Sequence, residues 1–190
     1  MRNDELLLVL DNCGCRARIW TTWQSVVRAV PRPRRPNARL IRARGVEADI
    51  LRLAGIYGPG RNALVKLREG DARRIVKPGQ VFNRVHVDDI AEVVRLLVGA
   101  GGLGGVWNVA DEEPAPPQDV VAYAAALLGL PPSPEEPFNE ARLSPMTAEF
   151  YADNKRVSIA KSKALLGFLP AYPTYREGLR ALAEAGQGRA

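Results

Sequence analysis

The hydrophobic positions fall into short runs and helical stripes that alternate along residues 46–190. Residues 49–53 form an aliphatic run of strand length, which predicts a buried strand. A second strand is predicted at residues 81–87, and a helix at residues 88–98 with Asp88 as its N-cap. The helix prediction rests on apolar positions at i, i+3, i+4 and i+7, namely Ile90, Val93, Val94 and Leu97.

The rest of the pattern continues this alternation. Strands are predicted at residues 73–77 and 106–110, and a Pro-rich loop at residues 130–137. Helices are predicted at residues 63–70, 117–128, 144–151, 159–166 and 174–185. Thr174 and Glu177 have the spacing of a capping box at the start of the last helix. This order of elements indicates an α/β fold.

A glycine-rich turn follows the strand at residues 49–53 and is the leading candidate for a binding site. Gly55, Gly58 and Gly60 let the backbone turn sharply and allow a ligand to approach the main chain. In open α/β sheets, ligands bind at the carboxyl ends of the strands. Tyr57 lies inside this turn and is therefore a candidate site residue. The alternative is a turn that serves only the strand-to-helix geometry.

Four segments occur in a specific order: Arg52-Leu-Ala-Gly-Ile-Tyr-Gly-Pro-Gly60, Val85-His-Val-Asp-Asp-Ile-Ala91, Gly105-Val-Trp-Asn-Val-Ala-Asp111, and the closing residues 161–179. Together they resemble the second half of an extended short-chain dehydrogenase/reductase of the NAD-dependent epimerase/dehydratase type. The resemblance implies the C-terminal part of a Rossmann-type parallel sheet with flanking helices and a small helical substrate lobe. It also implies NAD or NADP as cofactor, and redox or epimerase/dehydratase chemistry on a small substrate such as a sugar.

In the family that the chain resembles, the glycine turn lines the nicotinamide and substrate end of the cleft. The resemblance assigns cofactor binding to Gly55, Tyr57 and Gly58, and substrate binding to Arg61 and Arg84. Sugar-nucleotide epimerases place an arginine four residues before His86, where this chain has Phe82. That difference argues against a nucleotide-sugar substrate. His86 is the one histidine of the chain, and a hydrogen-bonded structural role is favoured for it over a titrating role.

Two motifs match an active site in their letters but not in their position. Gly99-Ala-Gly-Gly-Leu-Gly104 satisfies G-x-G-x-x-G, but the predicted helix precedes it and the predicted strand follows it. A pyrophosphate site needs the opposite order, so we predict a surface turn. Tyr151-Ala-Asp-Asn-Lys155 matches the Tyr-x-x-x-Lys pair of short-chain dehydrogenases, but it follows the glycine turn instead of preceding it. A structural role is favoured there, and no catalytic residue is assigned.

Composition excludes several classes of protein. The 190 residues suffice for one domain with a substantial core, and 46% hydrophobic with 25% charged residues is typical of a globular protein. No run of about twenty apolar residues exists, so no membrane span is predicted. The N-terminal residues do not resemble a secretory signal, and a cytoplasmic location is expected. Cys13 and Cys15 are too few for a disulfide framework and a poor metal site, so no metal is predicted.

The net charge of +6 comes entirely from residues 1–45, which hold ten arginines and three acids. This segment is Arg/Pro-rich, shows no clear periodicity and is expected to be poorly ordered, whereas residues 46–190 form the epimerase/dehydratase-like domain. Three interpretations stay open for residues 1–45. They are a frame-shifted or mis-started N-terminus, a genuine ordered element, and an arm that binds nucleic acid; nucleic-acid binding is the least favoured.

The sequence supports a truncated, inactive relative of an NAD(P)-dependent epimerase/dehydratase, since it has no phosphate-binding glycine loop in the expected place. One alternative is a non-catalytic binding or regulatory module on the same half-fold. The other is the nucleic-acid arm, whose affinity would fall steeply with salt. If the cofactor half is missing, residues 46–53 and 106–110 would expose strand edges, and self-association through the sheet edge is expected.

Overall fold

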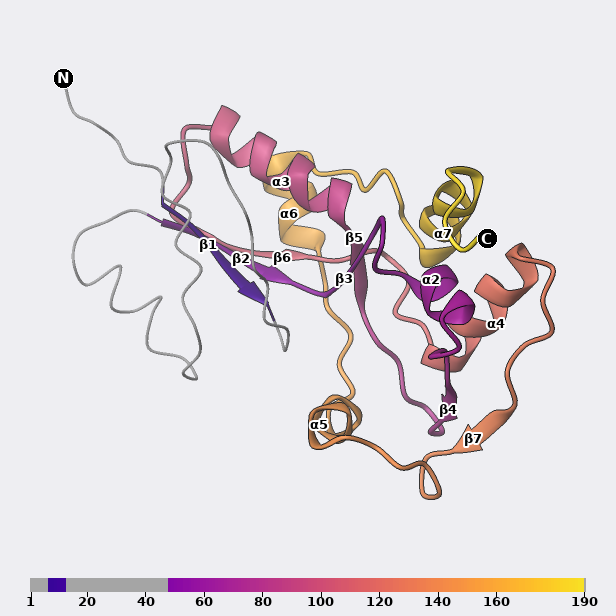
Figure 1. The fold of residues 1–190 in the computed structure, drawn as a ribbon. Coiled ribbons are helices and arrows are strands. Elements are labelled where there is room, and N and C mark those ends of the chain that lie inside the picture. The colour runs from indigo at the N-terminus through magenta and orange to yellow at the C-terminus, as the bar shows by residue number, and fades with distance from the viewer. Residues whose placement is uncertain (1–6, 13–47, 190) are drawn as a thin grey trace.

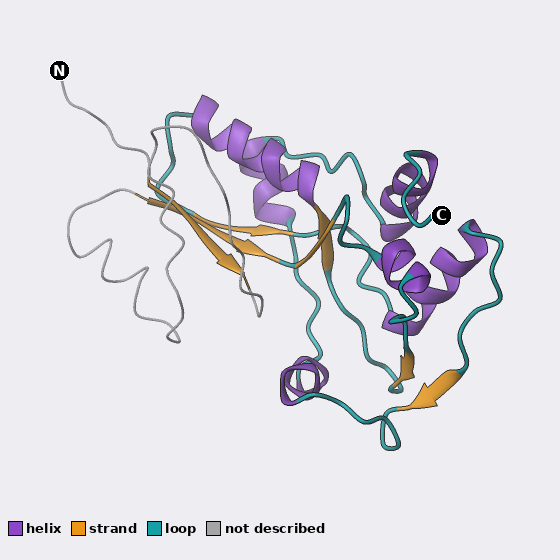
Figure 2. Ribbon diagram, viewed as in Figure 1, coloured by secondary structure: helices purple, strands orange, loops and turns teal. Residues whose placement is uncertain are grey.

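The structure, a computed structural model, describes residues 7–12 and 48–189. Its strands are β1 (Leu7–Asn12), β2 (Ala48–Leu53), β3 (Gly55–Tyr57), β4 (Arg74–Val76), β5 (Arg84–His86), β6 (Val106–Val109) and β7 (Glu135–Pro137). Its helices are α2 (Ala63–Arg68), α3 (Val87–Gly99), α4 (Pro117–Leu127), α5 (Pro145–Ala152), α6 (Ala160–Leu166) and α7 (Tyr175–Glu184). The parallel pairs β2–β6, β3–β5 and β4–β7 are each joined through helices, so the predicted α/β class is confirmed (Figure 2).

The largest sheet has three parallel strands in the order β1-β2-β6 (Figure 1). Leu51 of the central strand lies opposite Leu10 on one side and Trp107 on the other. Two shorter parallel pairs, β3–β5 and β4–β7, lie beyond it. Helices α3 and α6 lie together on one face of the large sheet, while α2, α4 and α7 gather at the opposite end of the molecule (Figure 1). This second group of helices is the helical lobe.

Two hydrophobic clusters stabilise the two ends of the molecule. The first joins the sheet to α3 and α6, and it includes Leu51, Val93, Leu97, Trp107 and Phe168, each at most 1% exposed. Full burial of one such side chain contributes about 1.5–3 kcal/mol. The second cluster fills the helical lobe and includes Tyr57, Leu64, Ala124, Tyr175 and Leu179. The glycine turn connects the two clusters, since it leaves the sheet and delivers Tyr57 into the lobe.

Most predicted elements are confirmed within one or two residues, because their signals are local. The capping box of Thr174 and Glu177 is present at the start of α7. Gly70 and Gly79 follow α2 and β4 with positive φ, as their turn roles require. Both cysteines, Cys13 and Cys15, lie outside the described residues.

The N-cap of α3 differs from the prediction. His86, not Asp88, caps this helix, and its side chain accepts a hydrogen bond from the backbone N–H of Asp88. The imidazole Nδ1 replaces the carboxylate because the strand runs into the helix without an intervening loop. Asp88 lies in the first turn instead, where its charge still favours the helix dipole.

Two further predictions, one of a strand and one of a loop, also need correction. The predicted strand at residues 81–87 is shortened to β5, and Phe82 forms only an isolated bridge to Ala115. The predicted loop at residues 130–137 ends in strand β7, which pairs with β4. Ion pairs of Arg73 with Glu136 and of Arg74 with Glu135 accompany this pairing. Tertiary pairing, rather than local propensity, therefore forms β7.

The expectation of exposed edges at residues 46–53 is not met, since β2 is the central strand of its sheet. Five of its six residues are buried. The strand that covers it, β1, lies within the N-terminal segment that was expected to be poorly ordered. Residues 13–45 are outside the described part of the chain, so the proposed character of that segment stays a prediction.

The Gly99–Gly104 loop has the order that the sequence predicted, with α3 before it and β6 after it. The fully buried carboxylate of Asp49 holds this loop. Its oxygens accept hydrogen bonds from the backbone N–H groups of Leu103 (3.0 Å) and Gly105 (2.8 Å). The indole Nε1 of Trp107 donates a third bond to it at 2.7 Å. Because these donors are already used inside the protein, they are not available to a ligand.

Candidate functional site

Tyr57 ends β3 directly opposite His86, which ends the parallel strand β5. Both side chains therefore lie at the carboxyl end of a parallel pair, where α/β proteins bind ligands. Tyr57 is only 8% exposed, and its hydroxyl has no hydrogen-bond partner among the described residues. Burial, reinforced by the charge of Asp111, holds the pKa of the Tyr57 hydroxyl well above its usual value. The phenol is therefore a neutral group at physiological pH.

His86 lies between two aromatic rings. Its ring centroid is 5.1 Å from that of Tyr57, edge to face, and 4.1 Å from that of Tyr172. Burial lowers the pKa of His86, so the neutral imidazole is favoured. Because Nδ1 accepts from the Asp88 backbone at 3.3 Å, the neutral ring carries its proton on Nε2. Nε2 is buried and has no partner among the described residues.

Asp111 follows β6 and brings a third polar group to the same end of the strands. It is 3% exposed, and neither carboxylate oxygen makes a hydrogen bond of good geometry with the described residues. Burial raises the pKa of Asp111 to about 7, although the neighbouring Arg84 opposes the rise. A carboxyl with such a pKa exchanges its proton near neutral pH.

Arg84 lies at the start of β5, and its guanidinium contacts the main chain. Nη1 donates to the carbonyl oxygens of Phe82 (3.0 Å) and Ala115 (3.1 Å). Burial lowers the pKa of Arg84, whereas Asp111 raises it. This arginine therefore joins two loops and balances the buried carboxyl; contact with a substrate stays a prediction.

Helix α7 and the segment before it close over these groups. A Cβ atom on Gly178 would lie 2.7 Å from ring carbons of Tyr57 and closer still to its hydroxyl, so only glycine fits there. Asp89 fixes the preceding segment, since its carboxylate accepts from the backbone N–H groups of Ala171 (2.7 Å) and Tyr172 (3.3 Å). The polar cluster of Tyr57, His86, Arg84 and Asp111 thus has three buried members, and Arg84 is half-buried beside them.

The other residues assigned by the resemblance lie around the rim of the glycine turn. Gly55 is exposed and Gly58 is buried. A Cβ on Gly58 would lie 2.7 Å from Val87 Cγ1 and 3.9 Å from His86 Nε2. Arg61 is exposed, and its backbone forms a two-way bridge with Gly58. The structure therefore gathers these residues at one turn, beside the buried polar cluster.

The described residues do not fit the pyrophosphate of a dinucleotide. The N–H groups of the glycine turn are occupied: Gly55 donates to Asn83, Gly58 to Arg61, and Gly60 to the side chain of Gln187. The Gly99–Gly104 loop is occupied by Asp49 and precedes a strand. Phosphate binding needs free N–H groups at the start of a helix. No group of three or more His, Cys, Asp or Glu in the described part of the chain could hold a metal ion.

Tyr151 and Lys155 make packing and ion-pair contacts, and the structural role favoured from the sequence stays a prediction. Tyr151 is 5% exposed and packs against Phe82 and Phe138, with ring centroids 5.2 Å away in both cases. Lys155 forms an ion pair with Asp153. The tyrosine is therefore held in an aromatic cluster with Phe82 and Phe138.

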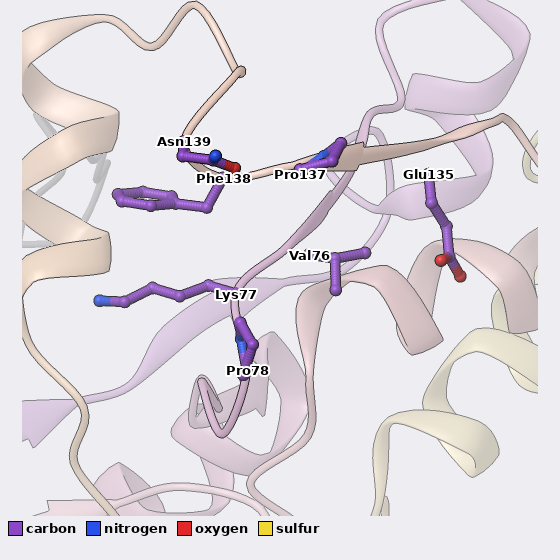
Figure 3. A pocket seen from close by; sticks show the side chains of 7 residues that line it. All are labelled: Val76, Lys77, Pro78, Glu135, Pro137, Phe138 and Asn139. Carbon is purple, nitrogen blue, oxygen red and sulfur yellow. The ribbon is translucent and has the colours of Figure 1, made fainter.

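A shallow hollow of about 510 Å³ lies along the β4–β7 pair (Figure 3). Lys77 and Phe138 extend beside each other on one side of it, and the lysine ammonium lies 5.1 Å from the ring centroid. Lys77 also donates to the carbonyl oxygen of Tyr151. Since its charge is used in these contacts and the hollow is open, we assign no site to it.

Comparison with known proteins shows which solved structures have a similar fold. No family model matches the chain. Among solved structures, a conserved protein of unknown function from Silicibacter pomeroyi is 49% identical, with a TM-score of 0.70, over 75% of this chain and 50% of that protein. The human epimerase family protein SDR39U1 with NADPH is 21% identical (TM-score 0.59, 73% of this chain and 49% of that one). UDP-glucose 4-epimerase of Thermus thermophilus with NAD is 20% identical (TM-score 0.65, 98% and 65%). The fold is therefore that of the NAD-dependent epimerase/dehydratase type of short-chain dehydrogenase/reductase, as the resemblance implied.

One curated relative that is similar in sequence is named as a reductase. The 3-diazoavenalumate denitrifying reductase of a Streptomyces species is 27% identical over 171 residues, which cover 83% of this chain and 53% of that protein. The chain thus spans about half the length of this relative. The likeness extends to a reductase in sequence and to epimerases in fold.

Asp111 and Asp89 are two buried polar residues at this end of the strands that the sequence did not single out as candidate site residues. Each lies next to another acid, Glu112 or Asp88, at a strand end or in the first turn of a helix, where an acid is usually a solvent-exposed cap. The available signal was that Asp111 directly follows a predicted strand, at the end where ligands bind.

Proposed function

We propose that this chain supplies the substrate-side part of an NAD(P)-dependent epimerase, dehydratase or reductase acting on a small, sugar-like molecule. The polar cluster at the carboxyl ends of β3, β5 and β6 carries this proposal. Three buried groups there, on Tyr57, His86 and Asp111, have unused hydrogen-bonding capacity. Unpaired polar groups are costly inside a protein and are retained mostly at functional sites.

In this proposal Gly55, Tyr57 and Gly58 line the nicotinamide end of the site, and Arg61 lies nearest an anionic group of the substrate. The main-chain contacts of Arg84 support a role in holding the site together, with substrate contact as a secondary role. The chain alone holds no cofactor tightly, because the described residues offer no free phosphate-binding turn. A cytoplasmic location is part of the same proposal.

The test is a titration of the purified full chain with NADH and NADPH, followed by calorimetry and nicotinamide fluorescence. We expect no binding up to millimolar cofactor. Micromolar binding would show that the chain is a complete dinucleotide site and would overturn the proposed division of roles.

The substrate side is tested separately by ligand-observed NMR with a panel of free sugars and sugar phosphates. We expect weak binding of a sugar phosphate that Arg61→Gln reduces severalfold, while Arg95→Gln, on the exposed face of α3, leaves it unchanged. Equal loss in both variants would indicate non-specific charge attraction and would contradict the assignment of Arg61.

A further inference from the structure

Helix α7 ends in a hydrogen-bond pattern that fixes the backbone of Gln187, just beyond the helix. Gly186 has a φ of +82°, and its N–H donates to the carbonyl oxygen of Ala183 at 3.0 Å. The N–H of Gln187 donates to the carbonyl oxygen of Leu182 at 2.9 Å. These two bonds define a Schellman motif, in which the glycine adopts the left-handed backbone conformation. The backbone of Gln187 is therefore held at a defined place beyond the helix.

The residues that follow Gln187 pack against helix α2. A Cβ atom on Gly188 would lie 2.8 Å from Leu64 Cβ and 3.0 Å from the Leu64 carbonyl oxygen, so a larger residue does not fit there. Arg68 Nη1 also donates to the carbonyl oxygen of Arg189 at 3.3 Å. Because α2 directly follows the glycine turn, these contacts bring Gln187 beside that turn.

The side chain of Gln187 is bonded to the glycine turn. Its Oε1 atom accepts a hydrogen bond from the backbone N–H of Gly60 at 2.8 Å, and Asn62 Nδ2 donates to the same oxygen at 3.4 Å. Asn62 Nδ2 also donates to the carbonyl oxygen of Gly58 at 2.9 Å. One oxygen atom of Gln187 therefore contacts the residues on both sides of Arg61.

The backbone of Arg61 is fixed by its own contacts as well. Its N–H donates to the carbonyl oxygen of Gly58, and its carbonyl oxygen accepts from the N–H of Gly58, each at 3.1 Å. Helix α7 contacts the other end of the same turn, where Gly178 packs against the ring of Tyr57. Helix α7 and Gln187 therefore contact the glycine turn at both of its ends.

We propose that Gln187 is a positioning residue: by holding the glycine turn, it sets where Arg61 meets an anionic group of the substrate. This inference rests on the proposed function, which assigns that group to Arg61. Gln187 acts through the turn and does not contact the substrate. A segment that is already ordered loses less conformational freedom when it binds, so we expect the effect in the affinity for an anionic substrate.

The first test removes the acceptor without shortening the side chain, in Gln187→Met. Since one hydrogen bond changes an equilibrium constant by about fivefold, exchange of the Gly60 amide with water should rise about fivefold, as measured by NMR of the full labelled chain. The affinity for glucose 6-phosphate should fall about fivefold. Gln118→Met is the matched control and should change neither, because Gln118 Oε1 accepts no hydrogen bond from the described residues. Unchanged Gly60 exchange in Gln187→Met would overturn the proposal.

Two further variants separate positioning from packing. Gln187→Glu retains an acceptor oxygen at the same length, so the Gly60 amide should exchange as slowly as in the unchanged chain. Exchange as fast as in Gln187→Met would show that the acceptor does not hold the turn. The double variant Arg61→Gln, Gln187→Met should bind glucose 6-phosphate as weakly as Arg61→Gln alone, because Gln187 acts through Arg61. Additive losses would contradict that route.

The positioning role and the proposed function fail in different ways. If Arg61→Gln weakens glucose 6-phosphate binding and Gln187→Met does not, the positioning role is overturned and the proposed function stands. If glucose 6-phosphate does not bind the unchanged chain, the assignment of Arg61 to an anionic group fails. The substrate part of this inference then fails with it, and Gly60 exchange in Gln187→Met decides whether Gln187 holds the turn.

Discussion

Tyr57 and Gly178 touch so closely that each restricts the other. A methyl group at position 178 would overlap the phenol ring, and such overpacking costs about 1–3 kcal/mol. We therefore expect Gly178→Ala to lower the free energy of unfolding by about 2 kcal/mol. Urea denaturation measures the change. Tyr57→Phe removes an unpaired hydroxyl and should be nearly neutral by itself.

The double variant Tyr57→Phe, Gly178→Ala isolates this contact. We expect it to recover part of the loss, because the atom nearest the added methyl is gone while the ring carbons remain. Gly99→Ala is the control, since a Cβ at Gly99 would meet nothing within 4 Å. Additive single-variant effects would show that the ring and the helix move independently.

Asp111 makes the stability of the fold depend on pH. Its pKa is about 7 in the folded chain against an ordinary 3.8, so between these values the folded state binds a proton that the unfolded state has released. Stability therefore falls as pH rises from about 4 to about 7, by at most roughly 4 kcal/mol at about 1.4 kcal/mol per pKa unit. Asp111→Asn should remove this slope, as measured by urea denaturation at pH 5 and pH 8.

Asp88→Asn is the matched control, because the Asp88 side chain is exposed. His86 contributes a slope of opposite sign, since a lowered pKa adds stability as pH rises, and it is retained in both variants. If the free energy of unfolding depends on pH in Asp111→Asn as it does in the unchanged chain, the Asp111 carboxyl is ionised in the folded state. Local sequence signals do not predict this behaviour, because Asp111 is buried beside Arg84, which lies far from it in the chain.

At the scale of elements, Asp49 connects the central strand to the loop between α3 and β6. Its replacement by alanine leaves two backbone N–H groups and the Trp107 indole without an acceptor. Unpaired buried donors cost about 1–3 kcal/mol each. We expect Asp49→Ala to lower the melting temperature strongly and to quench or shift Trp107 fluorescence. Asp71→Ala, at an exposed site, should change neither.

The elements that the sequence predicted correctly are those with local signals. Helix α7 has its capping box and an apolar stripe within its own ten residues. Strand β7 reads Glu-Glu-Pro, with neither alternation nor strand propensity, so only its pairing with β4 forms it. The histidine cap of α3 was missed for a similar reason. An imidazole is not a preferred N-cap, and its role depends on the strand that ends at the same residue.

At the scale of the whole molecule, Asp89 joins the sheet layer to the helical lobe. It lies on α3 and accepts from the backbone of Ala171 and Tyr172, which lead into α7. We expect Asp89→Ala to speed amide exchange in residues 171–184 at least tenfold while β2 and β6 stay protected. Hydrogen-exchange mass spectrometry measures this, with Asp88→Ala as control. Equal loss of protection in β2 would show that both ends unfold as one unit.

The overall architecture was predictable because four ordered segments resembled one family. The placement of β1 was not, since residues 7–12 lie in a segment whose charge and proline content obscured a strand. Within the described residues, no helix has both the length and the apolar character needed to cross a bilayer.

The helix that covers β6 also limits how large any assembly can become. Lys161 and Ser162 of α6 donate to the outward carbonyl groups of Val106 and Asn108, so these acceptors are not available to a strand of another molecule. A fibre grows only when every added molecule presents a free strand edge to the next molecule. Growth of the sheet from molecule to molecule through β6 is therefore disfavoured.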